Sequence, residues 1–225
     1  MNLSLKALLA GCCALALAGS ANAAELIVNG GFNNGATVSA PGGGFQTVGT
    51  GSSAITGWSI LSGDVDWIKG YWQSSDGDGF SIDMNGNNPG AIAQTINTVV
   101  GASYTLTFDM SGNPDNYRGD TRIAVIGAND SIIGSANYSL TGGNSAANMM
   151  WEARSFSFVA DSATTQISFT SGNGGDNCCF GAAIDNVSVT GAVPEPATWA
   201  MMMSGLFGMG LALRGRRTAS AAATA

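Results

Sequence analysis

The chain has 225 residues, with 33 glycines and only 10% charged side chains, a composition typical of many short strands joined by turns and not of helices. It contains no histidine, which excludes a Ser-His-Asp or Cys-His catalytic arrangement and a His-ligated zinc site. Residues 24–192 hold four basic and fourteen acidic side chains, and this net charge of −10 argues against nucleic acid and anionic lipid as partners and favours cations or neutral ligands.

The first 23 residues carry the features of an export signal. Lys6 precedes an apolar run over residues 7–18, and Ala21-Asn22-Ala23 places small residues at the spacing that a signal peptidase needs. The pattern predicts a signal helix that is removed by cleavage after Ala23. Leu9-Ala10-Gly11-Cys12 resembles a lipobox, which would make Cys12 a lipidated N-terminus, although an apolar run of only about five residues would precede that cysteine. Both alternatives stay open.

Period-two alternation of apolar side chains predicts strands within residues 24–192. The clearest case is residues 103–110, and the same alternation recurs along the chain between turn-rich segments. A one-residue break in the last apolar series predicts a bulge near Asp185 and Asn186. About ten short strands with turn signals between them predict one all-β domain, an antiparallel sandwich. The alternating residues are Phe80, Ile82 and Met84; Tyr104, Leu106, Phe108 and Met110; Phe156 and Phe158; Ile167 and Phe169; and Ile184, Val187 and Val189.

The C-terminal segment, residues 193–225, has three parts in a fixed order. A Pro-Glu-Pro motif is followed by an apolar run over residues 197–213 and then by arginines, the order expected of a membrane helix whose basic end stays in the cytoplasm. This order resembles the PEP-CTERM sorting signal of Gram-negative bacteria. The resemblance implies an inner-membrane intermediate, processing by an exosortase, and delivery to the cell surface or extracellular matrix, anchored or released. The motif residues are Pro194, Glu195 and Pro196, and Arg214, Arg216 and Arg217.

Residues 25–190 contain an ordered series of short motifs, namely Asn29-Gly30-Gly31-Phe32, Gly57-Trp58, Val65-Asp66-Trp67-Ile68, Tyr71-Trp72-Gln73, Ser81-Ile82-Asp83-Met84-Asn85-Gly86, Pro89-Gly90-Ala91-Ile92-Ala93-Gln94-Thr95, Thr107-Phe108-Asp109-Met110-Ser111-Gly112-Asn113-Pro114 and Ala183-Ile184-Asp185-Asn186-Val187. This series resembles the choice-of-anchor C family, which is similar to DUF642 domains and, more remotely, to galactose-binding-like jelly rolls. The resemblance implies a jelly-roll β-sandwich over residues 24–192. It implies no defined activity.

Four aromatic residues within residues 58–72 bear on ligand binding. We predict that Trp58 and Trp67 belong to the core, whereas core and surface positions stay open for Tyr71 and Trp72, which follow a glycine in a predicted loop. Exposed aromatic faces stack on sugar rings, and neighbouring Asp or Asn side chains bind hydroxyl groups. The sequence therefore predicts a site for polysaccharide or a cell-wall glycan. Its candidate residues are Asp66, Tyr71, Trp72, Gln73 and Asp83.

Two other functions stay open beside glycan binding. A structural or adhesive protein of the biofilm matrix would need no site for a small sugar. A glycoside hydrolase would use a pair of carboxylates, but nothing in the spacing of the acidic residues selects such a pair. We therefore name no catalytic residues and expect a protein that is not an enzyme.

Calcium is the one cofactor that the sequence suggests. Asp76-Gly77-Asp78-Gly79 puts two carboxylates in a flexible turn, an arrangement common in Ca²⁺ loops, and a solvated turn without metal is the alternative. The family resemblance implies a second position, a structural Ca²⁺ where the first and last strands meet. The residues that match that position are Asn29, Phe32 or Asn33, and Asp185.

Cys178 and Cys179 are adjacent in the sequence. In an oxidising compartment they should not stay free thiols. Adjacent Cα atoms lie about 3.8 Å apart, however, which is below the usual disulfide range of about 4.4–6.8 Å. A disulfide between the two, a bond to a second chain, and unpaired thiols all stay open.

Overall fold

Contacts divide the chain of the computed structural model into two units, Ala23–Val193 and a second formed by Met1–Asn22 with Pro194–Ala225. Within the second unit only Ser204 and Gly205, both helical, are described. Among the described residues no helix is long and apolar enough to cross a membrane. The predicted signal helix, Cys12, the sorting residues and the rest of the predicted membrane helix lie outside the described part. The structure describes residues 24–36, 44–115, 121–126 (backbone alone), 131–139, 143–172, 179–191 and 204–205.

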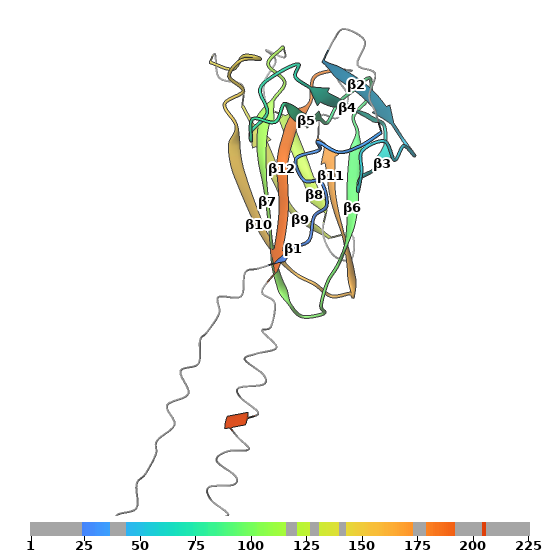
Figure 1. Ribbon diagram of the computed structural model, residues 1–225, viewed down its shortest axis with the longest axis vertical. Helices are drawn as coiled ribbons and strands as arrows, with labels where there is room; N and C mark the ends of the chain where they lie inside the picture. Colours follow the sequence, from blue (N-terminus) through green and yellow to red (C-terminus); the bar gives the residue numbers. More distant parts are fainter. Residues whose placement is uncertain are drawn as a thin grey trace, which may run out of the picture. The chain divides into compact units, whose positions relative to one another are not determined.

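Two antiparallel sheets form the larger unit, and Figure 1 shows them packed face to face. The seven-stranded sheet contains β1 (Ala24–Glu25), β2 (Phe45–Gly49), β4 (Asp64–Lys69), β5 (Phe80–Asp83), β7 (Ser103–Gly112), β10 (Glu152–Val159) and β12 (Ala182–Gly191). The five-stranded sheet contains β3 (Ser59–Ser62), β6 (Ala91–Asn97), β8 (Thr121–Ile126), β9 (Ile132–Tyr138) and β11 (Thr164–Ser171).

The strand order is β10-β7-β12-β5-β4-β2 in the larger sheet, with β1 added on β12, and β3-β6-β11-β8-β9 in the smaller. Every ladder between these strands is antiparallel. The predicted all-β antiparallel sandwich is therefore confirmed. The jelly-roll winding stays a prediction.

Apolar side chains from the inner faces of both sheets form the main core. Along β7 the predicted alternation holds, because Leu106 and Phe108 are buried between the sheets while Thr105 and Thr107 are partly exposed. Phe108 meets Phe169 of β11 edge to face, with ring centroids 5.0 Å apart. Each such side chain contributes about 1.5–3 kcal/mol through burial, so this contact between sheets is a main source of stability.

Two buried tryptophans tie the N-terminal segment to the sandwich. Trp58 Nε1 donates a hydrogen bond to the carbonyl oxygen of Asn29 (2.9 Å), and Trp67 Nε1 donates to that of Phe32 (2.8 Å). Both indoles are buried in the main core, which confirms the prediction made for them. Their N–H groups are satisfied by the backbone, so neither tryptophan offers a free polar edge to a ligand.

The predicted bulge in β12 is confirmed. Pairing with β7 shifts in register between Asp185 and Ser188, and Asn186 between them has φ 50°. Val187 N donates to the carbonyl oxygen of Gly30 (3.0 Å) at this point. A Cβ on Gly30 would lie 1.8 Å from the Val187 oxygen, so the N-terminal loop approaches the bulge as closely as it does only because residue 30 is glycine.

β4 is buried on both faces, and the side chains on its outer face line the candidate site. Val65 and Trp67 face the main core, whereas Asp66 and Ile68 face the opposite side of the seven-stranded sheet. There Ile68 joins a second small apolar cluster, which loops cover. The other members of this cluster are Trp72, Met149 and Ala183, with Trp151 packed against them.

Replacing Gly30 tests the close approach at the bulge. We expect Gly30→Ala to lower the free energy of unfolding by about 1–3 kcal/mol, since the loop or the bulge has to move to admit the methyl group. Urea denaturation measures the change. Gly49→Ala is the matched control, because a Cβ at residue 49 meets nothing within 4 Å. Equal effects of the two substitutions would contradict the close approach.

Candidate functional site

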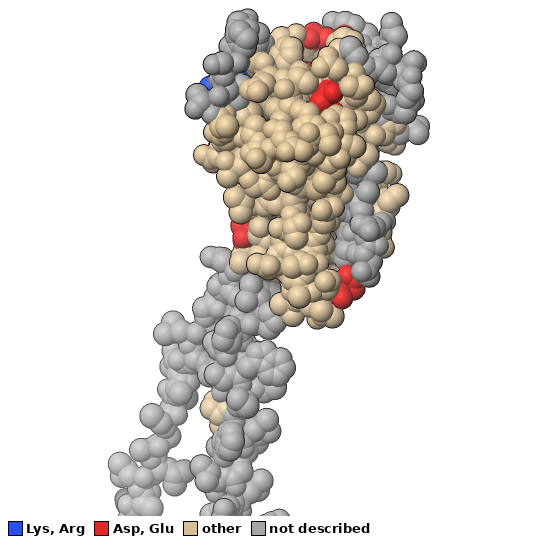
Figure 2. Space-filling view, turned by 90° about the vertical axis from the view of Figure 1, so that its right-hand side faces the viewer, with Lys and Arg blue, Asp and Glu red and all other residues tan. Residues whose placement is uncertain are grey.

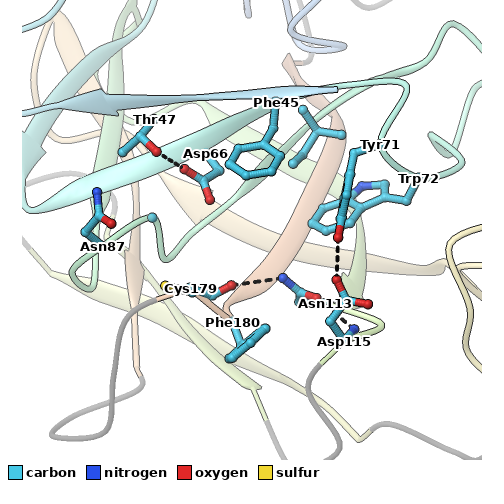
Figure 3. A pocket seen from close by; sticks show the side chains of 12 residues that line it. Phe45, Thr47, Asp66, Tyr71, Trp72, Asn87, Asn113, Asp115, Cys179 and Phe180 are labelled. Atoms are coloured by element: carbon cyan, nitrogen blue, oxygen red, sulfur yellow. Dashed lines mark hydrogen bonds between the residues drawn. The ribbon is translucent and has the colours of Figure 1, made fainter. Parts of the chain in front are cut away.

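A pocket of about 230 Å³ opens among β2, β4 and the loops that follow β4, β5 and β7 (Figure 3). The segment that leads into β12 completes its wall. Phe45, Thr47, Asp66 and Ile68 come from the two strands, and they share the outer face because Phe45 pairs with Ile68 and Thr47 pairs with Asp66. The other lining residues are Tyr71, Trp72, Gly86, Asn87, Asn113, Asp115, Cys179 and Phe180.

Three partly exposed aromatic rings stand at this pocket. Phe45, Tyr71 and Phe180 have exposed fractions of 38%, 40% and 40%. Tyr71 packs edge to face against Phe45 (5.4 Å between centroids) and against Trp72 (5.7 Å), so its ring is held on two sides. Trp72 itself is only 4% exposed, and its Nε1 donates to Ser81 Oγ (2.8 Å). Trp72 therefore supports the tyrosine ring from behind.

Asp66 is the acidic side chain that β4 brings to the pocket. It is 8% exposed, and Thr47 Oγ1 donates a hydrogen bond to its Oδ1 (2.6 Å). Gly86 allows the loop after β5 to lie against this carboxyl, because a Cβ there would stand 3.1 Å from Asp66 Oδ1. Burial raises the pKa of Asp66 above its ordinary value, and the nearby charge of Asp64 adds to the rise.

Asp83 lies beneath the pocket, as the cross-strand partner of Asp66 on β5. It is 1% exposed and does not line the cavity. Burial raises its pKa to about 8, although Asn85 N (2.9 Å) and Asn113 Nδ2 (2.8 Å) both donate hydrogen bonds to it. Asp83 therefore positions the residues around it and does not itself reach a ligand in the pocket.

Asn113 joins this buried carboxyl to the pocket wall. Its Nδ2 also donates to the carbonyl oxygen of Cys179 (3.1 Å), and its Oδ1 accepts from Asp115 N (2.9 Å). Asp115 Oδ2 in turn accepts from the Tyr71 hydroxyl (2.7 Å), and this hydrogen bond raises the pKa of Tyr71. A continuous series of hydrogen bonds thus runs from the sheet to the exposed tyrosine (Figure 3).

Of the predicted glycan-binding residues, Asp66, Tyr71 and Trp72 line the pocket and Asp83 supports it. Gln73 lies elsewhere: its Oε1 accepts from Met149 N (3.3 Å), and its carbonyl oxygen accepts from Trp151 Nε1 (2.9 Å). Gln73 therefore braces the loop before β10 and is not among the lining residues. Whether the pocket residues bind a ligand stays a prediction.

Sequence reasoning missed Phe45, Phe180, Asn113 and Asp115. Phe45 and Phe180 are single aromatic residues beside turn segments, so no alternation marked them. Asn113 was included only as part of a family motif and Asp115 was not singled out, although Asn and Asp beside a strand end carry the polar groups that a binding site needs. Polar residues at a strand end are the signal that would have found these two, and aromatic residues beside turns are the signal for Phe45 and Phe180.

The predicted calcium residues come from two loops that meet. Asn33 Nδ2 donates to Asp78 Oδ2 (2.8 Å), and a Cβ on Gly31 would stand 3.2 Å from Asp76 Oδ2. Asp185 is buried nearby and accepts from Ser75 N (2.8 Å); burial, together with the charge of Asp76, raises its pKa to about 7.

These residues do not form a ready metal site. Asn29 uses its side chain to join two loops, since Nδ2 donates to the carbonyl oxygen of Asn34 in its own loop and to that of Thr56 before β3. Asn33 turns its amide nitrogen, which cannot bind a cation, toward Asp78. Among the described residues no group of three or more Cys, Asp or Glu side chains is placed to hold a metal ion. Calcium therefore stays a prediction.

Cys179 lies in the pocket wall with φ 91° and takes part in a disulfide. Its neighbour Cys178 lies outside the described residues, so the pairing of the two stays a prediction.

Residues 25–190 match the family DUF642, a family described as of unknown function. The chain belongs to the DUF642 family. Residues 192–217 of this DUF642 protein match the PEP-CTERM protein-sorting motif, which indicates export to the cell surface. The sorting motif and the similarity to DUF642 domains are thus confirmed, whereas membership of the choice-of-anchor C family stays a prediction.

Halomucin of Haloquadratum walsbyi is 30% identical to this DUF642 protein over 174 residues, which cover 76% of this chain and 2% of halomucin. The chain therefore corresponds to a very small part of that relative. Among solved structures, TmCBM61 in complex with beta-1,4-galactotriose is 13% identical with a TM-score of 0.44, over 75% of this chain and 99% of that one. CBM35 from Paenibacillus barcinonensis is 16% identical with a TM-score of 0.43, over 64% and 98%. Both scores are too low to carry an argument.

The buried carboxyl of Asp83 predicts a dependence of stability on pH. Its pKa rises from 3.8 to about 8 on folding, so the folded protein holds the proton more tightly and loses stability as pH rises between about 4 and 8. We expect the free energy of unfolding from urea titrations to fall by at least about 1 kcal/mol over this range.

Asp83→Asn should make this dependence less steep, because an amide has no proton to lose, while Asp66 and Asp185, whose pKa values are also raised, keep their share of it. The control is Asp161→Asn, a change at an exposed acidic residue, which should leave the dependence as it is in the unsubstituted protein. An equally steep dependence in Asp83→Asn would show that Asp83 is not its source.

Proposed function

We propose that this protein is an exported, non-catalytic surface protein that binds a polysaccharide or cell-wall glycan in the pocket of Figure 3. The observation that carries the proposal is the combination of three partly exposed aromatic rings with carboxyl and amide side chains in one cavity. Aromatic faces stack on the apolar faces of sugar rings, and the polar groups pair with hydroxyls.

The support behind the aromatic rings favours binding. The Tyr71 hydroxyl is held by Asp115 and its ring is held by Phe45 and Trp72. A ring that is already fixed loses little conformational entropy when a ligand stacks on it, so more of the interaction energy remains as affinity. Asn87 and Asn113 add amide groups from two further loops.

The route to the surface is part of the same proposal. A signal peptidase removes residues 1–23, residues 197–213 hold an intermediate in the inner membrane of a Gram-negative bacterium, and an exosortase acts at the sorting motif. The match of residues 192–217 to the PEP-CTERM motif supports this route. The working form is then the sandwich at the cell surface or in the extracellular matrix.

A glycoside hydrolase finds little support in the geometry of the acidic pair. Asp66 and Asp83 are cross-strand neighbours with raised pKa values, which is a feature of catalytic carboxyls. Of these two only Asp66 reaches the cavity, because Asp83 is enclosed by its hydrogen bonds beneath it. The other acidic lining residue, Asp115, is occupied by the Tyr71 hydroxyl. A structural matrix protein without a sugar site is the other alternative. It would give no function to the exposed aromatic rings of the pocket.

Calcium belongs to the proposal as a structural ion between the loop of Asp76 and Asp78 and the bulge at Asp185. The charge of Asp76, which acts on the buried carboxyl of Asp185, supports it. We expect calcium at about a hundredfold above its Kd to raise the melting temperature by roughly 5–10 °C relative to chelator. Asp76→Asn should reduce the shift and Asp161→Asn should not. Identical melting curves with calcium and with chelator would remove calcium from the proposal.

Substitution of the exposed rings tests the glycan site. A glycan array of the purified protein identifies a ligand, and calorimetry then compares Phe45→Ala and Tyr71→Ala with the unsubstituted protein. Loss of one stacking ring should weaken binding about tenfold, which corresponds to about 1.4 kcal/mol.

Val100→Ala provides the matched control, because Val100 is an exposed apolar residue in the turn between β6 and β7, away from the lining residues. Its affinity should equal that of the unsubstituted protein. Thermal melting of each variant shows whether weaker binding comes from the missing ring or from loss of the fold. Full affinity in both aromatic variants would contradict the assignment of the site.

A further inference from the structure

Among the described residues, no cationic side chain pairs with the acidic side chains of the pocket. Asp66 and Asp115 lie on different sides of the group of side chains in Figure 3, on β4 and on the loop after β7. No Lys or Arg is among the described lining residues. Within the described part of the chain, the one salt bridge joins Arg154 to Glu152, which lie on β10 and do not line the pocket.

This arrangement of acidic side chains favours a ligand that carries a positive charge. A carboxyl buried as deeply as Asp66 is ionised at a cost, which protonation avoids and a nearby positive charge offsets. Its hydrogen bond from the neutral hydroxyl of Thr47 does not supply that charge. On the face of the molecule drawn in Figure 2 most side chains are uncharged and the acidic ones are spread singly. Asp66 and Asp115 are therefore the acidic partners that a cation on a ligand in this pocket would meet.

The aromatic rings of the pocket also favour a positively charged ligand. The faces of Phe45 and Tyr71 carry negative partial charge, and they attract an ammonium group within about 6 Å. The same rings offer an apolar surface to a sugar. A volume of about 230 Å³ lies below the range of about 300–1,000 Å³ for larger ligands, so the pocket suits a single sugar unit.

We propose that the pocket selects a protonated amino sugar, as one unit of a partly deacetylated polysaccharide, with its ammonium group between Asp66 and Asp115 and its ring on Tyr71 and Phe45. This inference rests on the proposed function and adds the ligand class to it. A uronic acid unit is disfavoured, because its carboxylate would meet two like charges. An N-acetylated unit fits the rings but leaves the acidic side chains without a counter-charge.

Calorimetry with three oligosaccharides of equal length tests the inference: a glucosamine oligomer, its N-acetylated counterpart and a galacturonic acid oligomer, each at pH 6 and low salt. We expect the glucosamine oligomer to bind at least tenfold more tightly than the acetylated one, and the uronic acid oligomer to bind least. Added salt should weaken binding of the amino sugar alone.

Two isosteric variants, Asp66→Asn and Asp115→Asn, should each reduce the preference for the amine over the acetylated oligomer about tenfold. Asp115→Asn changes an exposed residue and serves as the variant that folds even if Asp66→Asn does not. Asp161→Asn removes an equal charge outside the pocket and should leave the preference unchanged.

Equal affinity for the amine and the acetylated oligomer, or a preference that persists in both pocket variants, would overturn this inference and leave the glycan site standing. Absence of binding to all three oligomers and to every glycan on the array would overturn the proposed function as well.

Discussion

The hydrogen bond from Asn113 Nδ2 to the buried carboxyl of Asp83 joins the sandwich to the loops that form the pocket. Asp83 is fixed within the sheet by its strand and by Asn85 N, and Asn113 extends that rigid point to the segment before β12 and to the loop that carries Asp115. A buried polar group that loses its partner costs about 1–3 kcal/mol, so these loops are held to one arrangement. Tyr71, the exposed residue at the far end of this series of hydrogen bonds, is therefore held in place by the sheet.

The fold could be predicted because its main signals are local. Alternation in residues 103–110 marks a strand with one buried face, and this holds whichever strands lie beside it. The bulge at Asp185 and Asn186 was visible as a one-residue break in the same period. Trp58 and Trp67 were assigned to the core because a sandwich of this size needs large side chains and because Trp67 shares a strand face with Val65. Their indole N–H groups donate to backbone carbonyl oxygens there.

The site could be predicted only in part, because it depends on which strands become neighbours. Phe45 and Phe180 are 135 positions apart in the sequence, and they meet because the sheet places β2 and β12 on either side of β4 and β5. The positions of Asp83 and Gln73 could not be predicted either, although both lie close in sequence to residues that line the pocket. Asp83 is turned beneath the cavity and Gln73 toward the loop before β10, and neither direction follows from residue type.

β1 and the end of β12 pair side by side, with Ala24 opposite Gly191, so the chain enters and leaves the sandwich at one pole. The pocket wall stands at the start of β12, ten residues or about 33 Å away along the strand. Whichever end of the sandwich leads to an attachment, the chain therefore leaves the fold at this pole, and the lining residues of the pocket are not the ones through which it leaves.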